Sequence, residues 1–311
     1  MSKLDFKVAQ RAFAEAHEER RSPDFPRFEL AVWTKAAERL VQEGQLELAA
    51  FAVRRLKEQW PTLEWARNVH RLLEMTPALD PAAPPFRNDP SGGAQVIHRP
   101  GAETVILVFS GGNQAVGMPL PMLHQWLSRW PVSLVYLRDR KSLGYLAGVE
   151  PFGQDLAATL QALRSLIEEL GATRIVCYGL SYGGYGALRY GLELGAAAVV
   201  TLSGLVNMDP AFNTGLHYTE TARRLNEAFP DETLDLRELH LASSNPPAVF
   251  AAYAEHNWDD RIHAEHLAGL DGVVLIQAPG TKTHNTTVEL ILKGQYDDLM
   301  TDALGLPLPR H

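Results

Sequence analysis

Short apolar runs alternating with helical stretches dominate the chain from about residue 94 onward. Each run is apolar at consecutive positions, and together they cover residues 104–109, 133–137, 174–179, 197–202, 247–253 and 272–278. Consecutive apolar residues are typical of strands covered on both faces, and intervening helices indicate crossovers between parallel strands. The pattern predicts an α/β domain over residues 94–311, with a mostly parallel sheet of about six strands flanked by helices.

One connection between these runs is too long for a single crossover. Residues 205–245 contain two segments of helical character, YTETARRLNEAF and LDLRELHLA. We expect this stretch to form a helical cap inserted between two strands.

The first 75 residues differ from the rest of the chain, because from about residue 28 they show helical periodicity alone. The apolar positions predict three short antiparallel helices, interrupted at Gly44 and Pro61. Their spacing resembles a tetratricopeptide-type helix pair, carried by Ala37, Leu40, Gly44, Ala49, Ala52, Leu56 and Pro61. One pair is too few to bury its own faces, so this extension is expected to dock on the main domain or on a partner protein. A plain helical appendage is the alternative.

The segment between these two regions, residues 76–93, is rich in proline and ends in a glycine pair, which predicts a linker.

Composition excludes several classes of function. The 311 residues include 29 Lys and Arg against 37 Asp and Glu, for a net charge of -8, so a general nucleic-acid binder is not expected. The chain has a single cysteine, Cys177, which allows no internal disulfide and favours a cytoplasmic protein. Neither a signal peptide nor an apolar run long enough for a membrane span is expected.

A G-x-S-x-G motif at residues 179–183 is the main chemical signal. An apolar strand pattern ends at Gly179, and a helical pattern starts straight after Gly183. A serine on such a strand–turn–helix junction is a nucleophile elbow, in which flanking glycines let neighbouring backbones pass closely. The motif therefore predicts Ser181 as a nucleophile, with the backbone amide of Tyr182 as an oxyanion donor.

With this motif in this context, residues 94–311 resemble the α/β-hydrolase superfamily. The resemblance implies a nucleophile, an acid and a histidine in that order along the chain. His284 lies in the loop after the last predicted strand, where the superfamily keeps its general base. Asp260 follows the strand after the cap, in a pattern in which related hydrolases place the acid, with Asp259 and then Glu255 as alternatives.

The second oxyanion donor is expected in the loop after residue 109. The superfamily often has His-Gly there, whereas this chain has Ser110 before its glycines. We expect the donor to be Gly112, with Asn113 as the runner-up and as a substrate contact. Arg138 and Arg140 follow another strand, and at the ligand edge of the sheet they predict contacts to an anionic substrate.

Together these features predict a serine hydrolase that acts on an acyl ester or thioester through a Ser-His-Asp triad and a covalent acyl-enzyme. The same groups serve an O-acyltransferase, as in some bacterial enzymes that acetylate surface saccharides, so the acyl acceptor stays open. A non-catalytic hydrolase-fold interaction protein is a third alternative. No cofactor is expected. The histidines and aspartates of residues 256–266 match no zinc motif, so no metal is expected either.

Overall fold

The computed structural model describes residues 3–25, 29–112 and 114–308. The chain divides into two compact units. One comprises Met1–Asn88 with Pro119–Ser128, and the other comprises Asp89–Met118 with Arg129–His311.

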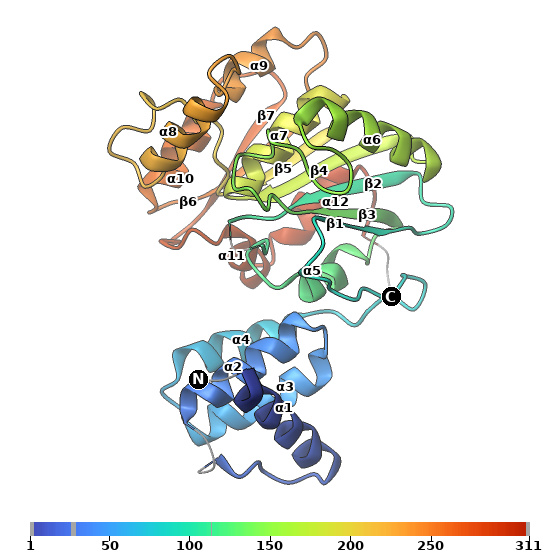
Figure 1. Cartoon of the computed structure of the whole chain (residues 1–311), viewed down its shortest axis with the longest axis vertical. Helices are drawn as coiled ribbons and strands as arrows, with labels where there is room; N and C mark the ends of the chain where they lie inside the picture. The colour runs from blue at the N-terminus through green and yellow to red at the C-terminus, as the bar shows by residue number, and fades with distance from the viewer. Residues whose placement is uncertain (1–2, 26–28, 113, 309–311) are drawn as a thin grey trace. The chain divides into compact units, whose positions relative to one another are not determined.

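The first unit is helical, as its sequence predicts (Figure 1). Its helices are α1 (Lys3–Glu18), α2 (Leu30–Gln42), α3 (Leu46–Gln59), α4 (Glu64–Met75) and α5 (Leu120–Leu127). Helices α2 to α4 match the three predicted helices, whereas α1 precedes the region whose periodicity was recognisable. Trp33 is fully buried, its ring centroid lies 4.9 Å from that of Phe13, and its indole N–H donates to the Phe25 carbonyl at 3.0 Å.

Helix α5 belongs to the helical unit although its residues lie within the α/β sequence. The ring of His124 stacks on Phe86 with centroids 5.1 Å apart, and its Nε2 lies 3.0 Å from the Pro84 carbonyl oxygen. Residues 76–88 of the proline-rich segment group with the helical unit and residues 89–93 with the other unit, and the role of this segment as a linker stays a prediction. The likeness of α2 and α3 to a tetratricopeptide pair stays a prediction.

The second unit is built on a seven-stranded sheet in the order β1-β3-β2-β4-β5-β6-β7. The strands are β1 (Ala94–Ile97), β2 (Thr104–Phe109), β3 (Val132–Leu137), β4 (Arg174–Leu180), β5 (Ala198–Leu202), β6 (Ala248–Ala254) and β7 (Val273–Ala278). Six of these match the predicted runs, and their pairings are parallel. The additional strand, β1, pairs antiparallel with β3 at the edge of the sheet.

Helices cover both faces of this sheet. They are α6 (Leu156–Glu169), α7 (Tyr182–Leu194), α10 (Trp258–His266), α11 (Thr286–Leu292) and α12 (Tyr296–Leu304). Alternate residues of β4 point to opposite faces. Cys177 belongs to the buried cluster that includes α7 residues, whereas the hydroxyl of the next residue, Tyr178, receives a hydrogen bond from Tyr296 of α12. Burial on both faces explains why the strands are apolar at consecutive positions.

The strand order reverses at β2, since β3 and β4 pair with its opposite edges. In open α/β sheets, ligands bind beside the carboxyl ends of the strands at such a reversal. The ends of β2 and β4 are Phe109 and Leu180, so the predicted oxyanion loop and Ser181 both emerge at this point.

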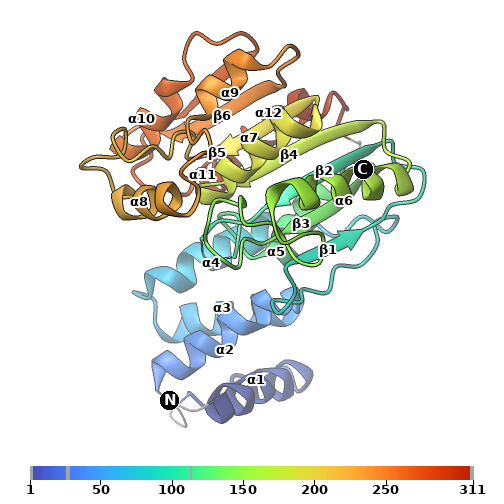
Figure 2. The same cartoon turned by 45° about the horizontal axis from the view of Figure 1, so that its top comes forward.

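The predicted cap lies between β5 and β6 and contains α8 (Thr219–Ala228) and α9 (Leu236–Ala242). Figure 2 shows both helices on the side of the sheet where β6 lies. The guanidinium of Arg189 on α7 donates to the Thr233 carbonyl at 3.2 Å and pairs with Glu232 at 2.9 Å, which ties the cap to the sheet domain. Among the described residues, no helix combines the length and the apolar character required to cross a membrane.

Candidate active site

Ser181 occupies a sharp turn between β4 and α7. Its φ of 57° and ψ of −122° are a conformation that L-residues rarely adopt. The turn is held by hydrogen bonds from the Ser181 amide to the Leu202 carbonyl and from the Leu205 amide to the Ser181 carbonyl, at 2.9 and 3.1 Å. Such backbone strain persists only where the surrounding structure enforces it, and it is concentrated at functional sites.

The two glycines of the motif are required by close backbone contacts. A Cβ atom at Gly179 would lie 2.1 Å from the Gly183 carbonyl oxygen, and one at Gly183 would lie 2.2 Å from the Phe109 carbonyl oxygen. Neither backbone contact leaves room for a side chain. The G-x-S-x-G pattern is therefore the sequence consequence of packing β4, α7 and the end of β2 around one serine.

His284 and Asp260 form a hydrogen-bonded pair next to this turn. Asp260 lies on α10, just after β6, and its carboxylate Oδ1 accepts from Nδ1 of His284, which lies in the loop after β7. The Asp260 side chain is fully buried, whereas 30% of the His284 side chain is exposed. Asp259 points elsewhere, and its carboxylate accepts from the His217 amide at 3.2 Å. Of the two aspartates, Asp260 therefore contacts the histidine and Asp259 does not.

Two hydroxyls that sequence reasoning did not identify support Asp260. Ser203 donates to its Oδ2 at 2.6 Å, and the Oγ1 atom of Thr286 lies 3.2 Å from the Ser203 hydroxyl. The Ala254 amide also points to Oδ2 at 3.4 Å. Ser203 immediately follows β5, and this position at the carboxyl end of a central strand is the signal that could have identified it.

Tyr218 of the cap lies between the serine and the histidine. Its hydroxyl oxygen is 2.9 Å from Nε2 of His284 and 3.4 Å from Oγ of Ser181. Burial is the largest influence on its phenol and raises the pKa of Tyr218, so the hydroxyl stays protonated at neutral pH. The Tyr218 hydroxyl therefore links Ser181 to His284. No periodicity in the cap sequence predicted this contact.

A cavity of about 240 Å³ opens beside Ser181 and His284. Its walls include Gly111, Gly112 and Gly117. The Gly111 amide is engaged by the Ala115 carbonyl at 2.8 Å, whereas the Gly112 amide has no acceptor within the described residues. Gly112, the predicted second donor, thus lines the same cavity as the serine. The alternative, Asn113, lies outside the residues that the structure describes.

The amide of Tyr182 is the other predicted oxyanion donor. Tyr182 is the first residue of α7, and the amides of a helix's first turn have no acceptor within that helix. The N-terminal end of the helix also carries partial positive charge. A role of these two amides in stabilising an oxyanion stays a prediction.

Arg138 and Arg140 are not in this cavity. Arg138 is buried and donates to the Gly92 carbonyl at 3.2 Å, while Arg140 donates to the carbonyls of Pro90 and Ser91. Both line a separate cavity of about 70 Å³. Their hydrogen bonds secure the segment before β1, and a contact to an anionic substrate stays a prediction.

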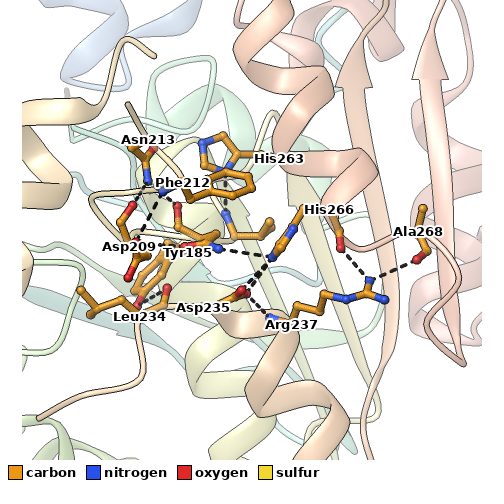
Figure 3. Close-up of polar contacts among 12 residues, drawn as sticks. Tyr185, Asp209, Phe212, Asn213, Leu234, Asp235, Arg237, His263, His266 and Ala268 are labelled. Atoms are coloured by element: carbon orange, nitrogen blue, oxygen red, sulfur yellow. Dashed lines mark hydrogen bonds and ion pairs between the residues drawn. The ribbon is translucent and has the colours of Figure 1, made fainter. Parts of the chain in front are cut away.

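The histidines of α10 anchor the cap. Nδ1 of the buried His263 accepts from the Val206 amide at 3.3 Å, and Nε2 of His266 lies 2.9 Å from the Asp235 carboxylate (Figure 3). Arg237 donates to the backbone carbonyls of His266 and Ala268, also drawn in Figure 3. In the part of the chain that the structure covers, no group of three or more His, Cys, Asp or Glu side chains is arranged to hold a metal ion.

The strand order, the serine on the turn after β4 and the acid and histidine after the next-to-last and last strands define an α/β-hydrolase fold. This confirms the predicted fold class.

Comparisons with known proteins give structural similarities at low sequence identity. No family model and no curated protein matches the chain. The esterase Pf2001 of Pyrococcus furiosus is 14% identical, with a TM-score of 0.46, over 68% of this chain and 87% of that one. Carboxyl esterase 2 of Tuber melanosporum is 14% identical, with a TM-score of 0.47, over 68% and 80%. Esterase B of Lactobacillus rhamnosis is 12% identical, with a TM-score of 0.46, over 76% and 94%.

Proposed function

We propose that this protein is a serine hydrolase that cleaves acyl esters or thioesters through a covalent acyl-enzyme. The observation that carries the proposal is that Ser181, on its strained turn, and His284, which is paired with Asp260, line the same cavity. These groups come from three separate connections of the sheet, and their order along the chain is that of the α/β-hydrolase pattern. A nucleophile, a base and a group that orients the base are the parts that acyl transfer requires.

In the proposed reaction, Oγ of Ser181 attacks the carbonyl carbon of the substrate while Nε2 of His284 takes its proton. The tetrahedral intermediate collapses as the C–O or C–S bond breaks, and the leaving group receives that proton from His284. Water then attacks the acyl-enzyme with His284 again as the base, and the proton returns to Oγ. Asp260 holds the imidazole in one tautomer and stabilises its protonated form.

The oxyanion of each tetrahedral intermediate is assigned to the amides of Tyr182 and Gly112. Both donors are backbone groups fixed by the turn after β4 and by the glycine loop after β2. A preorganised donor of this kind lowers the barrier because charge develops on the carbonyl oxygen in the transition state; removing one costs about 10² to 10³ in kcat in known cases.

The test is hydrolysis of p-nitrophenyl esters of increasing acyl length by the wild-type protein and by Ser181→Ala. We expect turnover of at least one ester and a loss of several orders of magnitude in the variant. Ser181→Ala removes a single oxygen, and circular dichroism would verify that its fold is retained. Equal rates for both proteins would contradict the proposal.

Acyl transfer to a hydroxyl is the second candidate. The proposed catalytic groups would serve it as well, because an acceptor hydroxyl would donate to Nε2 of His284 in the place of water. The experiment is incubation with an acetyl donor, with and without candidate saccharides. Donor loss that rises with saccharide, together with acetylated product, supports transfer, and donor loss independent of any saccharide supports hydrolysis.

A further inference from the structure

The two carboxylate oxygens of Asp260 bind different groups. Oδ1 accepts from Nδ1 of His284, whereas Oδ2 accepts from the Ser203 hydroxyl at 2.6 Å and from the Ala254 amide at 3.4 Å. The Asp260 side chain is fully buried, and a buried carboxylate needs hydrogen-bond donors to offset the hydration it has lost. Because the contact from Ser203 is much the shorter of the two, its hydroxyl is the main donor to Oδ2.

The backbone of Ser203 is strained. Its φ of 43° lies in the left-handed region, which glycine adopts without cost and residues with a Cβ atom adopt rarely. The residue is 1% exposed, and its amide donates to the Ala252 carbonyl at 2.7 Å. Glycine would suit this backbone better but would lack the hydroxyl that binds Asp260. A strained residue with a buried polar contact of this kind points to a role at the site.

Thr286 extends this contact to the segment that carries the histidine. It is the first residue of α11 and is fully buried, and its Oγ1 lies 3.2 Å from Oγ of Ser203. A serine hydroxyl has one proton and a carboxylate only accepts, so the Ser203 proton points to Asp260. The Thr286 hydroxyl is then the donor to Ser203. Successive donations in one direction polarise and strengthen each other.

The contacts form a closed ring. Thr286 follows His284 by two residues, and His284 binds Oδ1 of the carboxylate whose Oδ2 is bound by Ser203. The segment after β7 therefore reaches Asp260 twice, directly through the imidazole and indirectly through two hydroxyls. Rotation of the carboxylate about its Cβ–Cγ bond would break both contacts, so the ring fixes the orientation of the carboxylate toward the imidazole.

We propose that Ser203 and Thr286 are positioning residues that hold the Asp260 carboxylate in the orientation in which it binds the histidine. This inference rests on the proposed function. When His284 takes the serine proton it becomes positively charged, and a carboxylate that is already oriented stabilises this charge without rearrangement. Among the described residues that line the cavity beside Ser181, neither Ser203 nor Thr286 appears, so substrate binding should not depend on them.

The test measures p-nitrophenyl ester hydrolysis by wild type, Ser203→Ala, Thr286→Val and the double variant. We expect Ser203→Ala to lower kcat by about 10- to 100-fold, the size of one hydrogen bond to a charged group, with KM within about threefold. Thr286→Val keeps the shape of the side chain and should lower kcat by about three- to tenfold, the size of a neutral hydrogen bond. The double variant should be no slower than Ser203→Ala, because Thr286 acts through Ser203.

Ser203→Gly separates the hydroxyl from the backbone. It relieves the strained φ, so urea unfolding should show it at least as stable as Ser203→Ala, while its kcat should be equally low. Ser133→Ala is the matched control, since Ser133 is buried near the start of β3, away from the carboxyl ends of the strands, and its hydroxyl accepts from the Arg99 amide at 3.1 Å. Its kcat should stay within about twofold of the wild-type value.

Four results would each overturn the inference. They are a kcat of Ser203→Ala within about twofold of wild type, a recovered kcat in Ser203→Gly, losses that multiply in the double variant, and an equal loss in Ser133→Ala. The two proposals fail differently. If wild type hydrolyses an ester in a Ser181-dependent reaction but the Ser203 and Thr286 variants keep its kcat, the hydrolase proposal stands and the positioning proposal falls. If wild type hydrolyses no ester, both fall.

Discussion

Asp259 and Asp260 are neighbours in the sequence, but their side chains lie in different surroundings. Asp260 is 2% exposed and binds His284, Ser203 and the Ala254 amide. Asp259 is only partly buried, and its carboxylate accepts from the His217 amide of the cap. The sequence alone could not show which of them contacts the histidine, because two adjacent side chains on a helix point in directions about 100° apart. The three-dimensional position of His284 decides between them.

Replacing each aspartate by asparagine tests this difference. In Asp260→Asn, the amide can donate to Nδ1 of His284 and favour the wrong tautomer, so we expect kcat to fall by about 10³ to 10⁴. Asp259→Asn should change kcat by less than about threefold. Ester hydrolysis kinetics of the two variants provide the measurement, and a larger loss in Asp259→Asn would show that the acid is assigned wrongly.

Local chemistry made part of the site predictable. Ser181 is recognisable because close backbone contacts on both sides of its turn demand glycines, and His284 because it follows the last strand. Tyr218 and Ser203 were missed. The direction of a cap side chain depends on how the whole cap docks, and a serine after a strand is common without a site beside it.

At the scale of elements, the site depends on the crossing of β4, α7 and the end of β2. The backbone of Gly183 lies against the Phe109 carbonyl, where even a methyl group does not fit. The alternating apolar runs predicted β2 to β7 because strands buried on both faces leave a strong pattern. Strand β1 was missed because it has four residues, only one of them buried.

Gly183→Ala should therefore lower the free energy of unfolding and displace the serine. We expect a loss of about 2 to 4 kcal/mol, since backbone has to shift to relieve the contact. Gly92→Ala is a suitable control, because its added Cβ would meet its nearest neighbour at 3.4 Å, an ordinary contact. Urea unfolding of the two variants measures the difference, and equal stabilities would contradict the packing described for the turn.

At the scale of the whole molecule, sequence order and spatial grouping differ at α5. Its residues lie between β2 and β3 in the sequence, yet they group with the N-terminal helices. Periodicity shows that a helix is present but not which core its apolar face joins. The division of the chain was therefore predictable for α2 to α4 and not for α5.

Two buried histidines make stability depend on pH. Burial lowers the pKa of His263 in the α/β unit and of His124 in the helical unit, each to about 4. In the unfolded chain a histidine titrates near 6.5, so between these values the unfolded state binds more protons. Stability should fall as the pH drops from about 6.5 toward 4, by up to roughly 3 kcal/mol for each histidine.

Urea unfolding at pH 7 and pH 5, for wild type and for His263→Gln, measures this effect. The variant lacks one titrating group, so the difference between its two stabilities should be smaller than in wild type. The comparison within each protein cancels any constant loss caused by the substitution. If wild type and variant lose equal stability on acidification, His263 is not buried in its neutral form.

If Ser181 is an activated nucleophile, as we propose, a serine-directed covalent reagent should label it. Folded wild-type protein and Ser181→Ala are incubated with a fluorophosphonate, digested, and analysed by mass spectrometry for the modified residue. We expect one adduct, on Ser181, in wild type and none in the variant. An unlabelled wild-type protein, or an adduct on another residue that persists in Ser181→Ala, would contradict it and favour a hydrolase fold that serves as a scaffold.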